Sequence, residues 1–146
     1  MRSVENSVKQ ASGFIIKHTV RRGLLDITRE ISSWLDDQSI AAGLLTIFCT
    51  HTSASLLIQE NAAPEVRSDL EAFFDRIAPQ DPARYKHDDE GPDDMPAHLK
   101  TALTQVQLSI PVIDGRLALG TWQGIYLFEH RRHPHERRLA LHVVGA

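Results

Sequence analysis

The sequence has a single cysteine, Cys49, and few aromatic residues, which make up 6% of the chain. One cysteine excludes an intrachain disulfide, and its position in an apolar run is typical of a protein from a reducing compartment. No apolar stretch approaches the ~18 residues of a membrane span, and the N-terminal residues lack the apolar segment of a signal peptide. We therefore expect a cytoplasmic protein that does not cross a membrane.

The chain also lacks a strong charge of either sign. Its formal net charge is −3, so composition gives no reason to expect nucleic-acid binding. Apolar residues make up 42% of the 146 residues, which is enough to build a core without disulfides or a structural metal. We predict a single domain spanning residues 1–146. The unusual feature is the presence of eight histidines.

Hydrophobic patterning predicts an α+β fold, a largely antiparallel β-sheet sandwich with about three short helices. Strands are predicted at residues 13–20, 43–49, 54–60, 121–130 and 137–145, and in a hairpin over 106–120 with Asp114–Gly115 at its tip. Helices are predicted after a possible N-cap at Asp26, over 64–78, and from Pro96 to 105. The strand at 121–130 is apolar on both faces, which favours a central position.

The segment CTHTSAS, residues 49–55, places a histidine and four hydroxyl side chains between two apolar strands. Serine and threonine hydroxyls commonly close turns by bonding nearby backbone. Hydroxyls and backbone N–H groups at a turn also bind oxyanions such as phosphate. Both interpretations stand for Thr52 and Ser53, whereas Cys49 is expected to be a small buried side chain rather than a nucleophile.

The segment HDDEGPDDMPAH, residues 87–98, contains five carboxylates between two histidines. It belongs to a long predicted loop, and long loops in compact domains are usually functional or disordered. Imidazoles bind divalent ions, and a neighbouring carboxylate orients a ligating ring through its second nitrogen. The segment is therefore either a solvated loop or one side of a metal site.

Two further segments combine polar and apolar residues. In GTWQGIYLFEH, residues 120–130, the aromatic rings of Trp122 and Phe128 are expected to pack in the core. Gln123 is predicted to be a buried amide, which must bond to the protein or to a ligand. In EHRRHPHERR, residues 129–138, most charged residues suit a solvated turn, but Arg131 follows the strand directly and is a candidate phosphate ligand.

These segments, together with SIPVIDGRLALGTWQGIYLFEHR and the closing RRLALHVVG, resemble the YjbQ family of secondary thiamine-phosphate synthases. The resemblance covers about residues 13–145, and the combination of GTWQGI with DDMPAH is very specific. It implies a compact, mostly antiparallel α+β fold assembled as a homotrimer. It also implies a polar site near a subunit interface, made of His51, His87, Asp94, His98 and His130.

The family resemblance further implies a weak thiamine-phosphate synthase activity. That reaction joins hydroxymethylpyrimidine pyrophosphate to a thiazole phosphate and releases pyrophosphate. We assign His87, His98 and His130 to a divalent metal ion, Zn²⁺ or Mg²⁺, since three imidazoles and a water make an open catalytic site. We assign His51 and Asp94 to catalysis. Substrate and phosphate binding is assigned to Thr52, Ser53, Gln123 and Arg131.

Two other functions fit the same residues. The protein is then either a non-enzymatic trimer that binds a metal ion or a small phosphorylated metabolite, or a metal-dependent hydrolase. Metal content does not separate these alternatives from a transferase, but product formation does.

Overall fold

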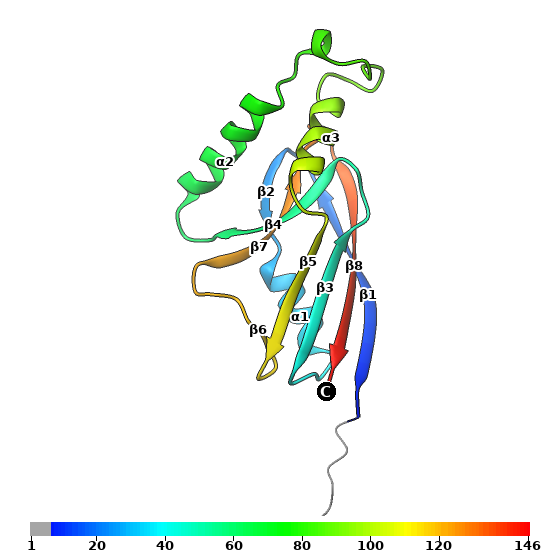
Figure 1. The fold of residues 1–146 in the computed structure, drawn as a ribbon, viewed down its shortest axis with the longest axis vertical. Coiled ribbons are helices and arrows are strands. Elements are labelled where there is room, and N and C mark those ends of the chain that lie inside the picture. The colour runs from blue at the N-terminus through cyan, green and yellow to red at the C-terminus, as the bar shows by residue number, and fades with distance from the viewer. Residues whose placement is uncertain (1–6) are drawn as a thin grey trace, which may run out of the picture.

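The computed structural model of the chain describes residues 7–146, which form two antiparallel sheets and three α-helices (Figure 1). The strands are β1 (Lys9–Thr19), β2 (Gly23–Asp26), β3 (Gly43–Cys49), β4 (Ala54–Glu60), β5 (Gln107–Ile113), β6 (Arg116–Leu117), β7 (Gln123–Glu129) and β8 (His135–Gly145). The helices are α1 (Thr28–Asp36), α2 (Pro64–Ile77), α3 (Asp94–Leu103) and a short 3₁₀ helix, η1 (Pro82–Arg84). None of the helices in this described part has the length and apolar character needed to cross a membrane.

The larger sheet has the strand order β1-β8-β3-β5-β6, and the smaller one has the order β2-β7-β4. Every pairing between these strands is antiparallel. The predicted fold class is thereby confirmed, including the central position of β7 in its sheet.

The hydrophobic core lies between the larger sheet on one side and α1 with the smaller sheet on the other. Alternating residues of β3 and β8 point inward, including Leu45, Ile47 and Leu141, which are at most 2% exposed. Ile27 and Ile31 at the start of α1 belong to the same cluster. Burying such side chains contributes about 1.5–3 kcal/mol each, so this layer provides a rigid support for the segments at its ends.

Sheet topology gathers the polar segments at one end of the molecule. β3 ends at Cys49 and β4 begins at Ala54, while β7 ends at Glu129 and β8 begins at His135. Figure 1 shows α3 at this same end, above the sheets. Residues 49–55, α3 and residues 129–135 therefore meet, although they are far apart in the sequence.

Most of the predicted elements are confirmed, and the strands at 43–49 and 54–60 have the predicted bounds. The strand β2 was not predicted, because its four residues show no alternating pattern and directly precede α1. The third helix begins at Asp94, two residues before the predicted start at Pro96. The predicted capping role of Asp26 is partly seen, since its Oδ1 accepts a hydrogen bond from Thr28 N at 2.9 Å.

Two predictions about the start of β7 are wrong. Trp122 is 63% exposed rather than packed in the core. Gln123 is also exposed, and its Oε1 accepts a hydrogen bond from Gly120 N at 2.8 Å. Both residues lie at the turn where β7 begins, before the strand enters the core, so the apolar character of the later residues does not extend to them.

Candidate functional site

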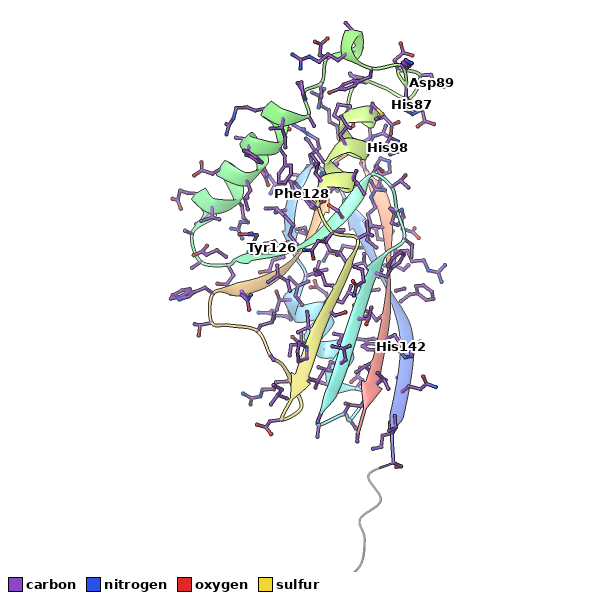
Figure 2. All side chains as sticks on the ribbon, viewed as in Figure 1. His87, Asp89, His98, Tyr126, Phe128 and His142 are labelled. Carbon is purple, nitrogen blue, oxygen red and sulfur yellow. The ribbon has the colours of Figure 1, made fainter. Side chains whose placement is uncertain are left out.

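The two histidines of the acidic segment meet at the carboxylate of Asp94. Asp94 and His98 are one turn apart on α3 and therefore share a face of the helix. Asp94 Oδ2 lies 2.8 Å from His87 Nε2 and 3.2 Å from His98 Nε2. One ligand atom each from His87, Glu90, Asp94 and His98 can be chosen so that all lie within 4.8 Å of one another. Figure 2 shows His87 and His98 near each other at this end of the molecule.

Arg131 fixes the acidic segment from the end of β7. Its Nη1 donates to Asp94 Oδ1 at 2.6 Å and its Nε to Asp93 Oδ2 at 3.1 Å. Its Nη2 donates to the carbonyl oxygen of Glu90 at 2.9 Å. All three nitrogens of the guanidinium therefore bond to one loop. Arg131 was predicted as a phosphate ligand. In the structure it positions carboxylates instead, because the acidic segment folds back onto its guanidinium group.

Asp94 is only 2% exposed, yet its environment favours the charged form. Burial raises the pKa of Asp94, but the hydrogen bond from His87 and the nearby charges of His98 and Arg131 outweigh it and leave the pKa below its usual value. The hydrogen bond to Asp94 in turn raises the pKa of His87. In the absence of an ion, Asp94 thus stabilises a positive charge beside it.

The orientation of His98 leaves one ring nitrogen pointing at this cluster. His98 Nδ1 lies 2.9 Å from the carbonyl oxygen of Thr52. A carbonyl only accepts, so Nδ1 is the protonated nitrogen and Nε2 has the free lone pair in the neutral ring. A backbone carbonyl that fixes the second nitrogen of a ring is a common arrangement around metal-binding histidines.

His130 is outside this cluster, in contrast to its predicted role as a ligand of the same ion. It is 1% exposed, and its Nε2 lies 2.9 Å from Ser55 Oγ. Its ring packs 4.3 Å from that of Phe128 between centroids. Burial, followed by the charges of Lys100 and Arg137, lowers the pKa of His130 to about 3. The side chain is therefore a neutral buried group, and within residues 7–146 its Nδ1 has no hydrogen-bond partner.

An open hollow of about 700 Å³ adjoins the cluster. Its wall includes His51, Thr52, His98 and Thr101, and the rest comes from Phe48, Cys49, Thr50, Ala102, Thr104 and Val106. The buried Oγ1 of Thr101 has no partner among the described residues. The hollow therefore combines apolar surface with a few polar groups beside the candidate metal ligands, an arrangement typical of small-molecule sites.

His51 is held in one neutral form. Its Nε2 accepts a hydrogen bond from the backbone N–H of Arg138 at 2.8 Å. A backbone amide always donates, so Nε2 is unprotonated and the ring proton is on Nδ1. Burial and the charge of Arg137 lower the pKa of His51, which favours the same form. His51 is thus arranged to donate a hydrogen bond from Nδ1.

The remaining predicted residues have mainly structural contacts. Ser53 Oγ accepts from Arg137 Nη2 at 3.0 Å, and Arg137 also pairs with the buried Glu129 at 2.6 Å. This supports the turn interpretation for Ser53. Gln123 lies at the opposite end of β7 from His130, so it is not brought to the cluster. Burial raises the pKa of Cys49 to about 11, which does not suit a nucleophile at neutral pH.

Sequence reasoning missed Glu90 and Asp93 as individual site residues. Both are in the acidic segment that the sequence singled out, but composition does not tell which of its five carboxylates face inward. That choice depends on Arg131 and on the turn at Gly91, whose φ of +99° is a conformation that glycine adopts without strain.

Comparison with known proteins assigns the chain to a family. Residues 12–146 match the family described as UPF0047 protein YjbQ-like, and the chain belongs to this family. It is 45% identical over 137 residues to a UPF0047 protein of Synechocystis, covering 94% of this chain and 93% of that one. It is 47% identical over 125 residues to the YjbQ protein of Salmonella typhimurium, covering 85% and 90%.

Solved structures of similar proteins have the same fold. A YbjQ-like protein of unknown function from Sulfolobus solfataricus is 25% identical and superposes with a TM-score of 0.85, covering 96% of this chain and all of that one. A hypothetical protein from Aeropyrum pernix is 32% identical with a TM-score of 0.83, covering 93% and 99%. The family and the fold are therefore established, and these descriptions name no activity.

Proposed function

We propose that the protein binds a divalent transition-metal ion through His87, Asp94 and His98, with Glu90 within reach. The donor set fits such an ion, because two imidazole nitrogens and carboxylate oxygens suit Zn²⁺ and its neighbours. Mg²⁺ fits less well, since it prefers oxygen ligands. The supporting observation is the convergence of both Nε2 atoms on Asp94 Oδ2. This ligand set replaces the three-histidine set that the sequence suggested.

The proposed activity is transfer of the pyrimidinylmethyl group of hydroxymethylpyrimidine pyrophosphate to the nitrogen of a thiazole phosphate, which gives thiamine phosphate. The C–O bond to pyrophosphate breaks, the C–N bond forms, and pyrophosphate leaves. A bound divalent ion would supply positive charge for the departing oxygens. The chain contributes the Nδ1–H of His51 as a hydrogen-bond donor at the wall of the hollow, and the apolar wall beside it suits an aromatic ring.

A homotrimer is part of this proposal, and the outer face of the larger sheet supports it. Phe14 and Phe48 are 53% and 45% exposed there, and Leu44 is 41% exposed. Exposed apolar patches of this kind commonly mark subunit interfaces. Phe48 also lines the hollow, so a second subunit on this face would border the proposed substrate site.

The metal part of the proposal is tested by titrating metal-free protein with Zn²⁺ in a calorimeter. We expect one ion per chain, and about tenfold or greater loss of affinity in His98→Ala and in Asp94→Asn. His133→Ala is the matched control, because His133 is exposed and outside the cluster. Wild-type affinity in His98→Ala would refute the proposed ligand set.

The activity is tested with hydroxymethylpyrimidine pyrophosphate and thiazole phosphate in the presence of Zn²⁺ or Mg²⁺. We expect thiamine phosphate and an equal amount of pyrophosphate from the wild-type protein and from His133→Ala, and neither from His98→Ala. No product above a control without protein refutes the transferase. Pyrophosphate release in the absence of the thiazole substrate identifies a hydrolase instead.

A further inference from the structure

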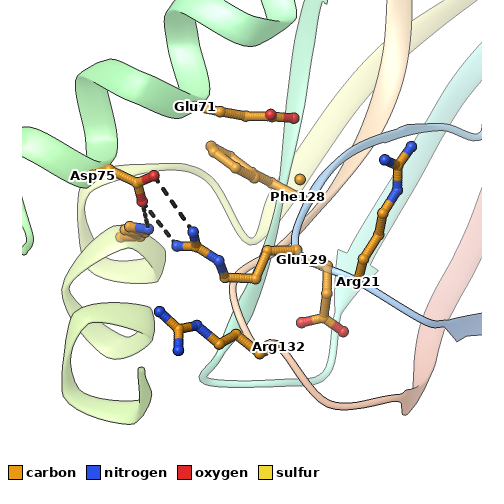
Figure 3. A pocket seen from close by; sticks show the side chains of 9 residues that line it. Arg21, Glu71, Asp75, Phe128, Glu129 and Arg132 are labelled. Carbon is orange, nitrogen blue, oxygen red and sulfur yellow. Dashed lines mark hydrogen bonds and ion pairs between the residues drawn. The ribbon is translucent and has the colours of Figure 1, made fainter. Parts of the chain in front are cut away.

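A second hollow, of about 310 Å³, lies on another side of α3 and shares no wall residue with the first (Figure 3). Its wall combines residues before and at the start of β2 with residues of α2, of α3, of the end of β7 and of the loop that follows β7. These residues are Arg21, Arg22, Gly23, Glu71, Asp75, Lys100, Phe128, Glu129 and Arg132. None of them belongs to the candidate metal cluster.

The hollow has an excess of positive charge. Four cationic side chains and three carboxylates line it. The charge of Glu129 is already balanced by Arg137, which lies outside the hollow and contacts Glu129 Oε2 at 2.6 Å. Four cations then face the two carboxylates of Glu71 and Asp75, which leaves a surplus of two positive charges.

Lys100 is the most informative residue of this hollow, because it is only 4% exposed. Its ammonium group has three N–H donors, and a buried charged group is expected to use them. Within residues 7–146 the ammonium makes one hydrogen bond, to Asp75 Oδ1 at 2.6 Å. Arg22 binds the same carboxylate at 2.9 Å, so two cations share one anion. Lys100 has donors to spare for a second negative partner.

Two arginines of the wall are uncommitted. Among the described residues, the guanidinium groups of Arg21 and Arg132 make no ion pair, although the backbone N–H of Arg132 holds Asp93 at 2.9 Å. Figure 3 shows Arg132 on the side of the hollow where Asp75 lies, and Arg21 on the other side. A guanidinium presents paired N–H groups that match two oxygens of an oxyanion.

We propose that this hollow binds a small doubly charged oxyanion of the phosphate type, with Lys100 and Arg132 as its principal ligands. The surplus of two positive charges matches the charge of such a ligand. The unused N–H donors of the buried Lys100 ammonium can bind its oxygens. The site requires neither the metal ion nor the transferase reaction proposed above. It is a separate binding site at the other side of the same helix.

The experiment is a calorimetric titration of the full-length protein with inorganic phosphate, with EDTA present and with ionic strength held constant by NaCl. We expect saturable binding of one phosphate per chain. Arg132→Gln should weaken binding about tenfold or more, as expected for a lost charged hydrogen bond. Arg116→Gln is the matched control, since Arg116 is exposed on β6 and does not line the hollow.

Lys100→Met provides a second test, and it should abolish binding while the circular dichroism spectrum stays that of the wild-type protein. If Lys100→Met does not fold, Arg132→Gln and Arg21→Gln still decide the question. Absence of saturable binding at millimolar phosphate, or wild-type affinity in both arginine variants, overturns the proposal. Loss of phosphate binding in His98→Ala places the anion at the metal cluster and also overturns it.

Discussion

At the scale of single residues, the partner of each ring nitrogen decides what a histidine can do. His98 has its Nδ1 on the Thr52 carbonyl and its Nε2 directed at Asp94. His51 has its Nε2 occupied by a backbone N–H, which leaves Nδ1–H as a donor. His130 is buried and neutral. Three histidines at one end of the fold therefore have three different chemical characters.

The low pKa of His130 predicts a loss of stability in mild acid. The folded ring has a pKa of about 3, whereas an unfolded histidine takes up a proton below about 6.5. The unfolded state then binds more protons, so the free energy of unfolding falls as pH drops from about 6.5, by up to ~1.4 kcal/mol per pH unit for this group. Urea unfolding between pH 7 and 5, with EDTA present, measures the slope.

His130→Gln should reduce this slope, while His133→Gln should leave it unchanged because His133 is exposed. His87 affects stability at higher pH than His130 does. Because its pKa is raised in the folded state, its contribution to the free energy of unfolding is fully present below about pH 6.5 and is lost as pH rises through the folded pKa. An unaltered slope in His130→Gln would contradict the assignment.

Cys49 gives a second prediction at the residue scale. It is 1% exposed, burial raises its pKa to about 11, and its Sγ contacts the carbonyl oxygen of Ala54 at 3.4 Å. At pH 7.5 the native thiol should therefore react with iodoacetamide far more slowly than the same thiol in guanidinium chloride. Mass spectrometry of timed samples measures both rates, and equal rates would show that the thiol is accessible and ionised.

At the scale of elements, the acidic segment and the start of α3 depend on one side chain from another part of the chain. Arg131 contacts Asp93, Asp94 and the carbonyl of Glu90, and it lies 37 residues after Asp94. Without these contacts, the carboxylates of the segment would repel one another. The loop is therefore ordered by the end of β7 rather than by its own sequence.

Replacing Arg131 by lysine should weaken metal binding without unfolding the protein. A lysine keeps the charge but loses the paired N–H groups that bind Asp93 and Asp94 together. Residues that orient metal ligands typically change affinity by about 10–100-fold, so Zn²⁺ affinity should fall within this range. Arg132→Lys is the control, since the hydrogen bond from Arg132 to the segment comes from its backbone N–H, which the substitution keeps. Equal affinities in the two variants would argue against a positioning role.

At the scale of the whole molecule, the two faces of the larger sheet differ in what covers them. The inner face is covered by α1 and the smaller sheet, whereas the outer face presents Phe14, Leu44 and Phe48. A partly apolar sheet face is costly to leave in water. In the proposed trimer, a neighbouring subunit would bury these apolar side chains of the outer face.

Phe48→Asp should therefore dissociate the proposed trimer, because it places a charge in the proposed interface. Light scattering after size-exclusion chromatography measures the mass of the particle. Phe73→Asp is the matched control, as Phe73 on α2 is 46% exposed, close to the 45% of Phe48. A wild-type protein that is monomeric at micromolar concentration, or a trimer that survives Phe48→Asp, would contradict this proposal.

The cytoplasmic location stays a prediction.

The sequence predicted those elements whose residues follow a strong pattern. The apolar strands at 43–49 and 54–60, the amphipathic helix that begins at Pro64, and the hairpin at Asp114–Gly115 all have local signals that neighbouring residues reinforce. β2 has no such signal, since four residues are too few to show a period. It is defined by its pairing with β7 at the edge of the smaller sheet, where Leu24 lies opposite Phe128.

By itself, the sequence determined the fold class, because the hydrophobic period that distinguishes strands from helices is a local property. It also marked the acidic segment with its two histidines as a candidate metal site. Only the tertiary structure decided which side chains of these segments meet. It brought Glu90 to His87 and Asp94, buried His130 beside Ser55, and turned Arg131 toward the carboxylates. The reason is physical: long-range contacts set the rotation of each side chain, and no local pattern encodes them.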